Sequence, residues 1–249
     1  MSPYRLLAAL LVALPLAAVG AEAKIAVASN FAAPAKALIT AFSASSGHRY
    51  ALSSSSSGKL YAQISNGAPF DLLLSADQKT PQQLIDEGLA SAASRFTYAQ
   101  GTLVLWSAEP ATLGDGETVL RAGNFRHLAI AAPDLAPYGK AAEQTLAALG
   151  LSDALKAKLV TGENIAQAHQ FAASGNAELG FIAWSQVMKD GQLTSGSVWV
   201  VPTELYQPLK QDAVLLNTGA DNEAAKAFLT FLKSEAALAI MDSYGYRRP

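Results

Sequence analysis

ALSSSSSGKLYAQISNGAPFDLLLSAD, residues 51–77, predicts in order the end of a strand, a run of five serines, a glycine, a short helix, a turn and a buried strand. A helix that begins at Gly58 would direct its unpaired N–H groups, and the positive end of its dipole, toward the serine hydroxyls. Helix N-termini of this kind bind anions. The segment therefore predicts a site for a small oxyanion.

Strands and helices alternate on both sides of this segment. Strands are expected at residues 24–28, 49–53 and 70–74, and helices are expected to end at Gly47 and Gly88. Alternation of this kind is typical of a parallel sheet that is covered by helices on both faces.

A second run of alternation follows residues 96–106, a long predicted strand interrupted by Gly101, where we expect the chain to leave a first lobe. The β-rich segment 197–216 contains two prolines and suggests a return crossing. We therefore predict an α/β fold of two lobes, each a mostly parallel sheet flanked by helices, with a ligand cleft at the hinge. The predicted lobes are residues 24–99 plus 215–249, and residues 100–214.

The N-terminus, residues 1–23, has the features of a cleaved signal peptide. Arg5 supplies the positive region, residues 6–19 are apolar, and Ala21-Glu22-Ala23 fits the small-x-small cleavage pattern. We expect cleavage after Ala23, with Ala21 as the alternative. An uncleaved N-terminal anchor is the other interpretation, but the apolar run is short for a membrane span. No later stretch is long and apolar enough to cross a bilayer.

Composition excludes several classes of function. The net charge of −2 argues against nucleic acid or an anionic membrane as the main partner. The chain has no cysteine, which excludes thiol catalysis and cysteine metal sites. His48, His127 and His169 do not have metal-ligand spacing, and no G-x-S-x-G motif is present. We expect no catalytic residue, no cofactor and no bound metal cation.

Four loops lie where a ligand of an open α/β sheet binds, beyond the carboxyl ends of the strands and before helices. They are Ser29-Asn30, Ser53 to Gly58, Ala136 to Gly139 and Gly162 to Ile165. Lys59 and Lys140 are expected near the mouth of the cleft, where their role would be electrostatic steering. Asp71, Asp77 and Asp134 could form a carboxylate cluster, although Asp77 is better explained as a helix cap and Asp134 as part of a turn.

The serine run has three alternative interpretations. It could be a flexible surface loop. Ser56-Ser57-Gly58-Lys59 also matches S-x-x-K, but the companion motifs of penicillin-recognising enzymes are missing. A phosphate loop would need glycine at position 53 and a hydroxyl residue at position 60, where this chain has Ser53 and Leu60.

The motifs resemble the periplasmic molybdate-binding protein family over essentially the whole mature chain. Five segments carry the resemblance: Val27-Ala28-Ser29-Asn30-Phe31, the serine run with Tyr61-Ala62-Gln63-Ile64, residues 67–77 (GAPFDLLLSAD), Ala136-Pro137-Tyr138-Gly139, and Tyr244-Gly245-Tyr246. The resemblance implies a periplasmic-binding-protein fold of type II with a hinged cleft. It also implies capture of molybdate, and usually tungstate, for an ATP-driven importer whose permease lies in the inner membrane. We accordingly expect a periplasmic monomer.

The resemblance also implies which residues bind the oxyanion. Ser29 and Ser57 match the hydroxyl donors of the first lobe, and Tyr138 and Ile165 match backbone N–H donors of the second. Many members add a tyrosine hydroxyl at a position that here is Ala183, next to Trp184. Asn30 resembles the residue of a branch in which an asparagine supplies that extra contact.

Physical chemistry agrees with a site built from neutral donors. Hydroxyl and N–H dipoles can hold a dianion through charge-assisted hydrogen bonds. Protonated phosphate would also need an acceptor, so donors alone select against it. Two alternatives remain: a binding protein for another tetrahedral oxyanion such as sulfate, and a periplasmic enzyme or sensor on the same fold.

Overall fold

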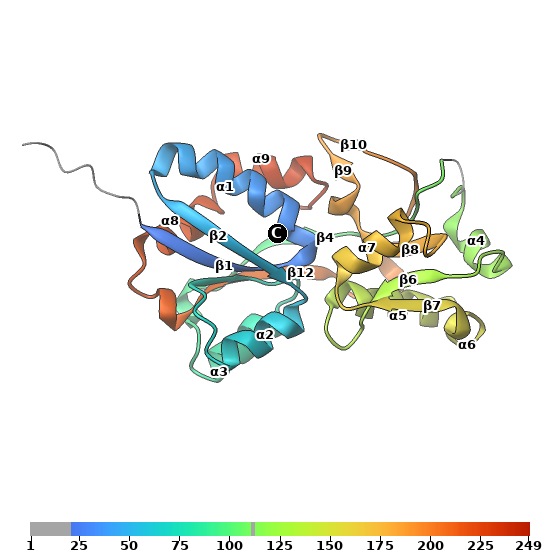
Figure 1. Cartoon of the computed structure of the whole chain (residues 1–249), viewed down its shortest axis with the longest axis horizontal. Helices are drawn as coiled ribbons and strands as arrows, with labels where there is room; N and C mark the ends of the chain where they lie inside the picture. The colour runs from blue at the N-terminus through green and yellow to red at the C-terminus, as the bar shows by residue number, and fades with distance from the viewer. Residues whose placement is uncertain (1–20, 111–112) are drawn as a thin grey trace, which may run out of the picture.

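The computed structural model describes residues 21–110 and 113–249, which form two α/β lobes side by side (Figure 1). Each lobe is built on a five-stranded sheet, with strand orders β2-β1-β3-β12-β4 and β11-β5-β8-β6-β7 in the described residues. The predicted two-lobed α/β fold is confirmed. No helix in the described ranges has the length and apolar character needed to cross a bilayer.

The first lobe contains the strands β1 (Glu22–Ala28), β2 (Arg49–Ser55), β3 (Leu72–Leu74), β4 (Phe96–Gly101) and β12 (Leu209–Leu215). Its helices are α1 (Ala32–Ser46), α2 (Ser57–Ser65), α3 (Lys79–Asp86), α8 (Glu223–Phe231) and α9 (Glu235–Ser243), with short 3-10 turns η1 (Ser29–Phe31), η2 (Ala92–Ser94) and η6 (Asn217–Gly219).

The second lobe contains the strands β5 (Leu103–Ser107), β6 (Leu128–Ala131), β7 (Leu159–Gly162), β8 (Leu179–Ala183) and β11 (Ser197–Val200), and a hairpin of β9 (Met188–Lys189) and β10 (Gln192–Leu193). Its helices are α4 (Gly116–Ala122), α5 (Pro137–Ala148), α6 (Ser152–Leu155) and α7 (Ile165–Ala173), with 3-10 turns η3 (Lys156–Lys158), η4 (Trp184–Gln186) and η5 (Thr203–Leu205).

Both sheets are mixed rather than mostly parallel. In the first sheet β1 pairs in parallel with β2 and β3, whereas β12 is antiparallel to β3 and β4. In the second, β6 is parallel to β7 and β8, whereas β5 is antiparallel to β8 and β11. The parallel pairs come from the strand–helix units. The antiparallel pairs involve the strands next to the crossings between lobes.

The two crossings between lobes lie elsewhere than the predicted boundaries. The chain leaves the first sheet after Gly101, at the end of β4, and enters the second at Leu103. It has returned by Leu209, because β12 pairs with β3 and β4. Residues 209–214, predicted in the second lobe, therefore belong to the first sheet. The hydrophobic pattern identifies a strand but does not identify its partners.

The first strand also begins earlier than residue 24. Ala23 is fully buried and aligns with Tyr50, and the Arg49 N–H donates to the carbonyl of Ala21 at 3.0 Å. Cleavage after Ala23 would therefore remove a core residue of β1. Residues 1–20 of the predicted signal peptide lie outside the described residues.

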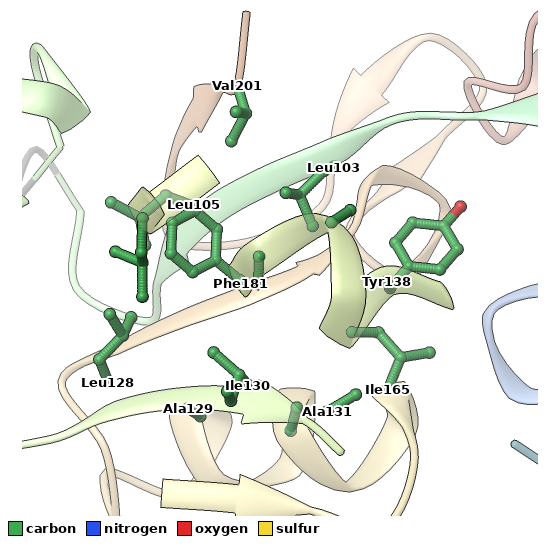
Figure 2. Close-up of a cluster of buried hydrophobic side chains, with 14 of the residues drawn as sticks. Leu103, Leu105, Leu128, Ala129, Ile130, Ala131, Tyr138, Ile165, Phe181 and Val201 are labelled. Atoms are coloured by element: carbon green, nitrogen blue, oxygen red, sulfur yellow. The ribbon is translucent and has the colours of Figure 1, made fainter. Parts of the chain in front are cut away.

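A buried apolar cluster in the second lobe includes side chains from β5, β6, β8, α5 and α7 (Figure 2). Two residues of the first lobe belong to the same cluster: Ala28, the last residue of β1, and Ala76, which follows β3. The lobes are thus in apolar contact, and residues at the strand ends are buried between them.

Candidate functional site

The serine run divides into two parts with different environments. Ser53 and Ser54 lie in β2, at the edge of the first sheet, and are exposed. Ser56 caps α2 by accepting a hydrogen bond from the Lys59 N–H at 3.4 Å, and Ser57, the first residue of the helix, is only 1% exposed. The helix begins one residue earlier than predicted. The structure therefore excludes a wholly flexible surface loop for this run.

The hydroxyl of Ser57 is held by the segment that follows β3. The Ala76 N–H donates to Ser57 Oγ at 3.1 Å, and Ser75 Oγ, which also lies 3.1 Å from Asp77 Oδ1, is 3.2 Å from Ser57 Oγ. Because Ser57 Oγ accepts the Ala76 N–H, its hydroxyl is held in place while its own proton can rotate toward a ligand. The GAPFDLLLSAD segment thus positions a hydroxyl donor.

Ser29 and Asn30 lie directly after β1, in the turn η1, and are 8% and 2% exposed. The β1 strand is buried along its last four residues, so the turn begins inside the protein. The Asn30 side chain donates both of its amide hydrogens, to Gln211 Oε1 and to the Tyr246 hydroxyl, each at 2.9 Å. Its amide donors are therefore already used.

Tyr138 and Ile165 are placed by the starts of two neighbouring helices in the second lobe. Pro137 occupies the first turn of α5 just before Tyr138, and the Asn164 side chain caps α7 at Ile165. Within the described residues, no hydrogen bond uses the backbone N–H of Tyr138 or of Ile165. Two orphan donors therefore point out of helix N-termini. Their side chains, 1% and 3% exposed, lie at one end of the apolar cluster (Figure 2).

Interlobe contacts bring these residues to one interface. The Gly58 N–H donates to the Leu135 carbonyl at 2.9 Å, which joins the start of α2 to the loop before α5. Ser185 Oγ donates to the Asn30 carbonyl at 2.8 Å, and α7 contacts η1. A cleft of about 680 Å³ opens beside this interface, between Gly58 and Ala76 on one side and Ala136 and Pro137 on the other.

Sequence reasoning missed the polar network behind Asn30. Gln211 in β12 is fully buried, and its Oε1 accepts hydrogen bonds from Asn30 and from the Tyr98 hydroxyl at 3.0 Å. The Tyr246 hydroxyl donates to the Asn30 carbonyl at 3.0 Å. The signal in the sequence was Gln211-Asp212, a polar pair inside an apolar strand, but only the fold shows what it contacts.

The hydroxyls of this network stay protonated over the physiological range. Burial raises the pKa of Tyr246 to about 12, and burial also raises the pKa of Tyr98 and of Tyr138 well above the usual value. The buried phenols are therefore neutral hydrogen-bonding groups rather than phenolates, which would repel an anion.

The two lysines predicted at the cleft mouth are both ion-paired. Lys59 Nζ lies 2.6 Å from Glu163 Oε2, a pair that joins the two lobes, and Lys140 Nζ lies 2.6 Å from Glu143 Oε2 in the same helix. Lys140 lines the cleft. Since each positive charge is matched by a carboxylate, neither lysine acts as an isolated attracting charge.

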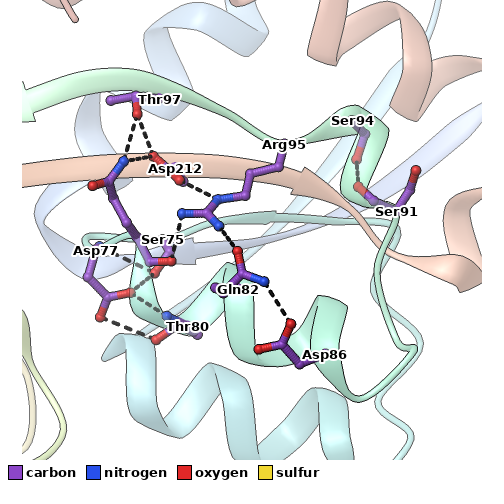
Figure 3. A network of polar contacts seen from close by, with 11 residues as sticks. Ser75, Asp77, Thr80, Gln82, Asp86, Ser91, Ser94, Arg95, Thr97 and Asp212 are labelled. Carbon is purple, nitrogen blue, oxygen red and sulfur yellow. Dashed lines mark hydrogen bonds and ion pairs between the residues drawn. The ribbon is translucent and has the colours of Figure 1, made fainter.

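Asp71 and Asp77, which the sequence suggested could belong to a carboxylate cluster, accept hydrogen bonds from different segments. Asp77, one residue before the N-cap Gln78, accepts a hydrogen bond from the Thr80 N–H in the first turn of α3 at 2.8 Å, and Asp71 accepts one from the Lys24 N–H. Figure 3 shows Asp77 in a polar network with the ion pair between the partly exposed Arg95 and the buried Asp212, whose Nε–Oδ2 distance is 2.6 Å. No group of three histidine, aspartate or glutamate side chains suited to a metal ion occurs in residues 21–110 and 113–249.

Comparisons with known proteins agree with this geometry. Residues 23–247 match the family described as bacterial extracellular solute-binding protein. The molybdate-binding protein ModA of Azotobacter vinelandii is 54% identical over 92% of this chain and 91% of its own length. That of Rhodobacter capsulatus is 50% identical over 96% of this chain and 93% of its own.

Solved structures of binding proteins share the fold of this chain. The Azotobacter vinelandii periplasmic molybdate-binding protein superposes with a TM-score of 0.88 at 41% identity, covering 91% of this chain and 99% of that one. The sulfate-binding protein SubI from Mycobacterium tuberculosis H37Rv, with a TM-score of 0.72 and 16% identity over 92% of this chain and 87% of that one, shares the fold.

Proposed function

Because the chain belongs to the bacterial extracellular solute-binding protein family, in its molybdate-binding branch, we propose that it captures molybdate in the periplasm and delivers it to an ABC importer. Tungstate, which has the same charge and shape, is proposed as a second ligand. The proposed partners are the oxyanion and the permease in the inner membrane, with the binding protein acting as a monomer.

The observation that carries the proposal is a buried interface equipped with neutral donors. We assign the oxyanion to the hydroxyls of Ser29 and Ser57 and to the backbone N–H groups of Tyr138 and Ile165. Two of these donors come from each lobe, so the ligand would hold the lobes together. The helix dipoles of α2, α5 and α7 would add favourable electrostatic energy. This chemistry needs no cofactor and no bound cation.

The fifth contact is proposed to come from the backbone N–H of Asn30. Ala183 cannot supply a hydroxyl, and the side-chain amide hydrogens of Asn30 are committed to Gln211 and Tyr246. The backbone N–H lies in the first turn of η1, where it has no intrahelical partner. Asn30 would then have two roles: its backbone N–H would bind the oxyanion, and its side-chain hydrogen bonds would hold η1 in place.

Export is proposed to follow removal of the N-terminal segment after Ala21. This cleavage point leaves all of β1 intact, including the buried Ala23, whereas cleavage after Ala23 would shorten the strand. N-terminal sequencing of the mature protein distinguishes the two.

Titration calorimetry tests the function on the mature protein. We expect tight binding of molybdate and of tungstate, and much weaker binding of sulfate and phosphate. Phosphate is disfavoured because a donor-only site leaves its P–OH proton without an acceptor. Sulfate binding tighter than molybdate binding would instead assign the protein to another oxyanion, and turnover of a bound substrate would establish an enzyme.

Replacing Ser57 by alanine is expected to weaken molybdate binding roughly ten- to a hundredfold, because a hydrogen bond to a charged group is lost. The same titration measures the affinity of the Ser57→Ala variant for molybdate. Ser53→Ala is the matched control, because Ser53 belongs to the same run but is exposed on β2. The Ser53→Ala variant should bind molybdate as tightly as the parent protein. Equal losses for the two variants would remove Ser57 from the site.

A further inference from the structure

Gln211 is an unusual residue for a central strand. It lies on β12, between β3 and β4, next to a register shift at Gln211/Asp212, and its side chain is fully buried. An uncharged amide in such a place must satisfy two donors and an acceptor locally. Its contacts therefore show what it is for.

The carbonyl end of the Gln211 amide is fixed by the first lobe. Asn30 Nδ2 donates to Gln211 Oε1 at 2.9 Å, and the Tyr98 hydroxyl, whose one proton is shared with the Ser75 carbonyl, lies 3.0 Å from each oxygen. The amide donor of Asn30 determines which way the Gln211 amide faces. The Nε2 group is consequently directed away from Asn30.

The amino end of the amide reaches the second lobe. Gln211 Nε2 donates to the Tyr138 hydroxyl at 3.2 Å. Gly101 leaves the space for this contact, since a Cβ at that position would lie 2.0 Å from the Tyr138 hydroxyl oxygen and 2.6 Å from Gln211 Nε2. Figure 2 shows the phenol oxygen of Tyr138 turned away from the apolar cluster of its own lobe.

We propose that Gln211 is a positioning residue that joins the two halves of the oxyanion site in the closed protein. One amide group fixes Asn30, in the turn that carries Ser29, and also fixes Tyr138, whose backbone N–H is assigned to the ligand. The contact with Tyr138 crosses between lobes, so it forms on closure and breaks on opening. The inference rests on the proposed function, because it concerns how molybdate is retained.

The first test is Tyr138→Phe, which keeps the backbone N–H and removes only the hydroxyl. In the closed protein Gln211 Nε2 would lose its buried partner. Stopped-flow measurement should show molybdate dissociation accelerated about tenfold, the scale of one buried hydrogen bond. The association rate should not change, because the bond forms only after the ligand is bound.

Tyr206→Phe is the matched control. Tyr206 is also a buried second-lobe tyrosine, and its hydroxyl accepts a hydrogen bond at 3.2 Å from the N–H of Leu103, in the same lobe. Its loss should lower the melting temperature and leave the dissociation rate at the parental value. A merely structural role for the Tyr138 hydroxyl would give the same pattern as this control.

A second variant separates positioning from loss of a polar group. Gly101→Ala retains every donor and acceptor but places a methyl group where the Tyr138 hydroxyl lies, so dissociation should again accelerate. If the parent protein binds molybdate but both Tyr138→Phe and Gly101→Ala release it at the parental rate, the proposed role of Gln211 is overturned. A parent protein that failed to bind molybdate would instead overturn the proposed function itself.

Discussion

Replacing Gly139 with alanine is expected to weaken molybdate binding by about a hundredfold and to lower the stability of the protein. A Cβ at this position would lie 2.2 Å from the Ala131 carbonyl oxygen and 2.7 Å from its carbon. These are backbone atoms at the end of β6, so they cannot rotate away, and the first turn of α5 must shift instead. Overpacking of this kind costs about 1–3 kcal/mol.

The shift reaches the ligand because Tyr138 is the preceding residue. A hydrogen-bond donor that moves by a fraction of an ångström loses alignment with an anion held by several fixed groups. Calorimetry and thermal melting of the same preparation measure the two effects.

Gly114→Ala is the control for Gly139→Ala. Gly114 lies in the same lobe, and a Cβ there would meet no atom of the described residues within 4 Å. It should therefore change neither affinity nor melting temperature. If Gly139→Ala also matched the parent in both measurements, α5 would not be packed against the end of β6 as described.

Replacing Ile165 with proline should weaken molybdate binding by about 1.5–3 kcal/mol, the scale of one hydrogen bond to a charged group. Proline removes the backbone N–H but suits the first helical position. The preceding residue, Asn164, already has the extended conformation that proline requires, with φ −155° and ψ 174°. The fold should therefore survive, which circular dichroism and melting of the unliganded protein would verify.

Ile165→Val is the appropriate comparison for the proline variant. The Ile165 side chain is 3% exposed within the apolar cluster, so its packing is a core contact. Valine has nearly the size of proline and keeps the donor, and its packing cost is about 0.5–1.5 kcal/mol of stability. A folded proline variant that binds molybdate as tightly as the valine variant would remove the Ile165 N–H from the site.

Local patterns in the sequence were sufficient to place the elements of the candidate site. A buried strand followed by Ser29-Asn30, and a serine run followed by an amphipathic helix, gave the two first-lobe loops nearly to the residue. The loop ending at Asn164 likewise gave the start of α7, whereas α5 begins at Pro137, inside the segment that was expected to be a loop up to Gly139. These signals depend on neighbours within a few residues, and such neighbours can be read directly from a sequence.

Contacts between distant segments could not be predicted in the same way. Residues 209–215 were recognisable as a strand, but their pairing with β3 and β4 depends on the whole topology. The partners of Gln211 are 181 and 113 residues away along the chain at Asn30 and Tyr98. The pairing of Lys59 with Glu163 also needed the relative position of the lobes. Whether the five assigned residues bind the ligand stays a prediction.

The return of β12 to the first sheet has a consequence for how the chain is made. The strand separates β3 from β4 in space, although both precede it by more than a hundred residues in sequence. Until residue 215 has been synthesised, the first sheet lacks the strand that joins β4 to β3, and the Asn30–Tyr246 bond spans 216 residues. Closing loops of that length is slow. A nascent chain therefore cannot complete its first sheet until most of its length has been synthesised.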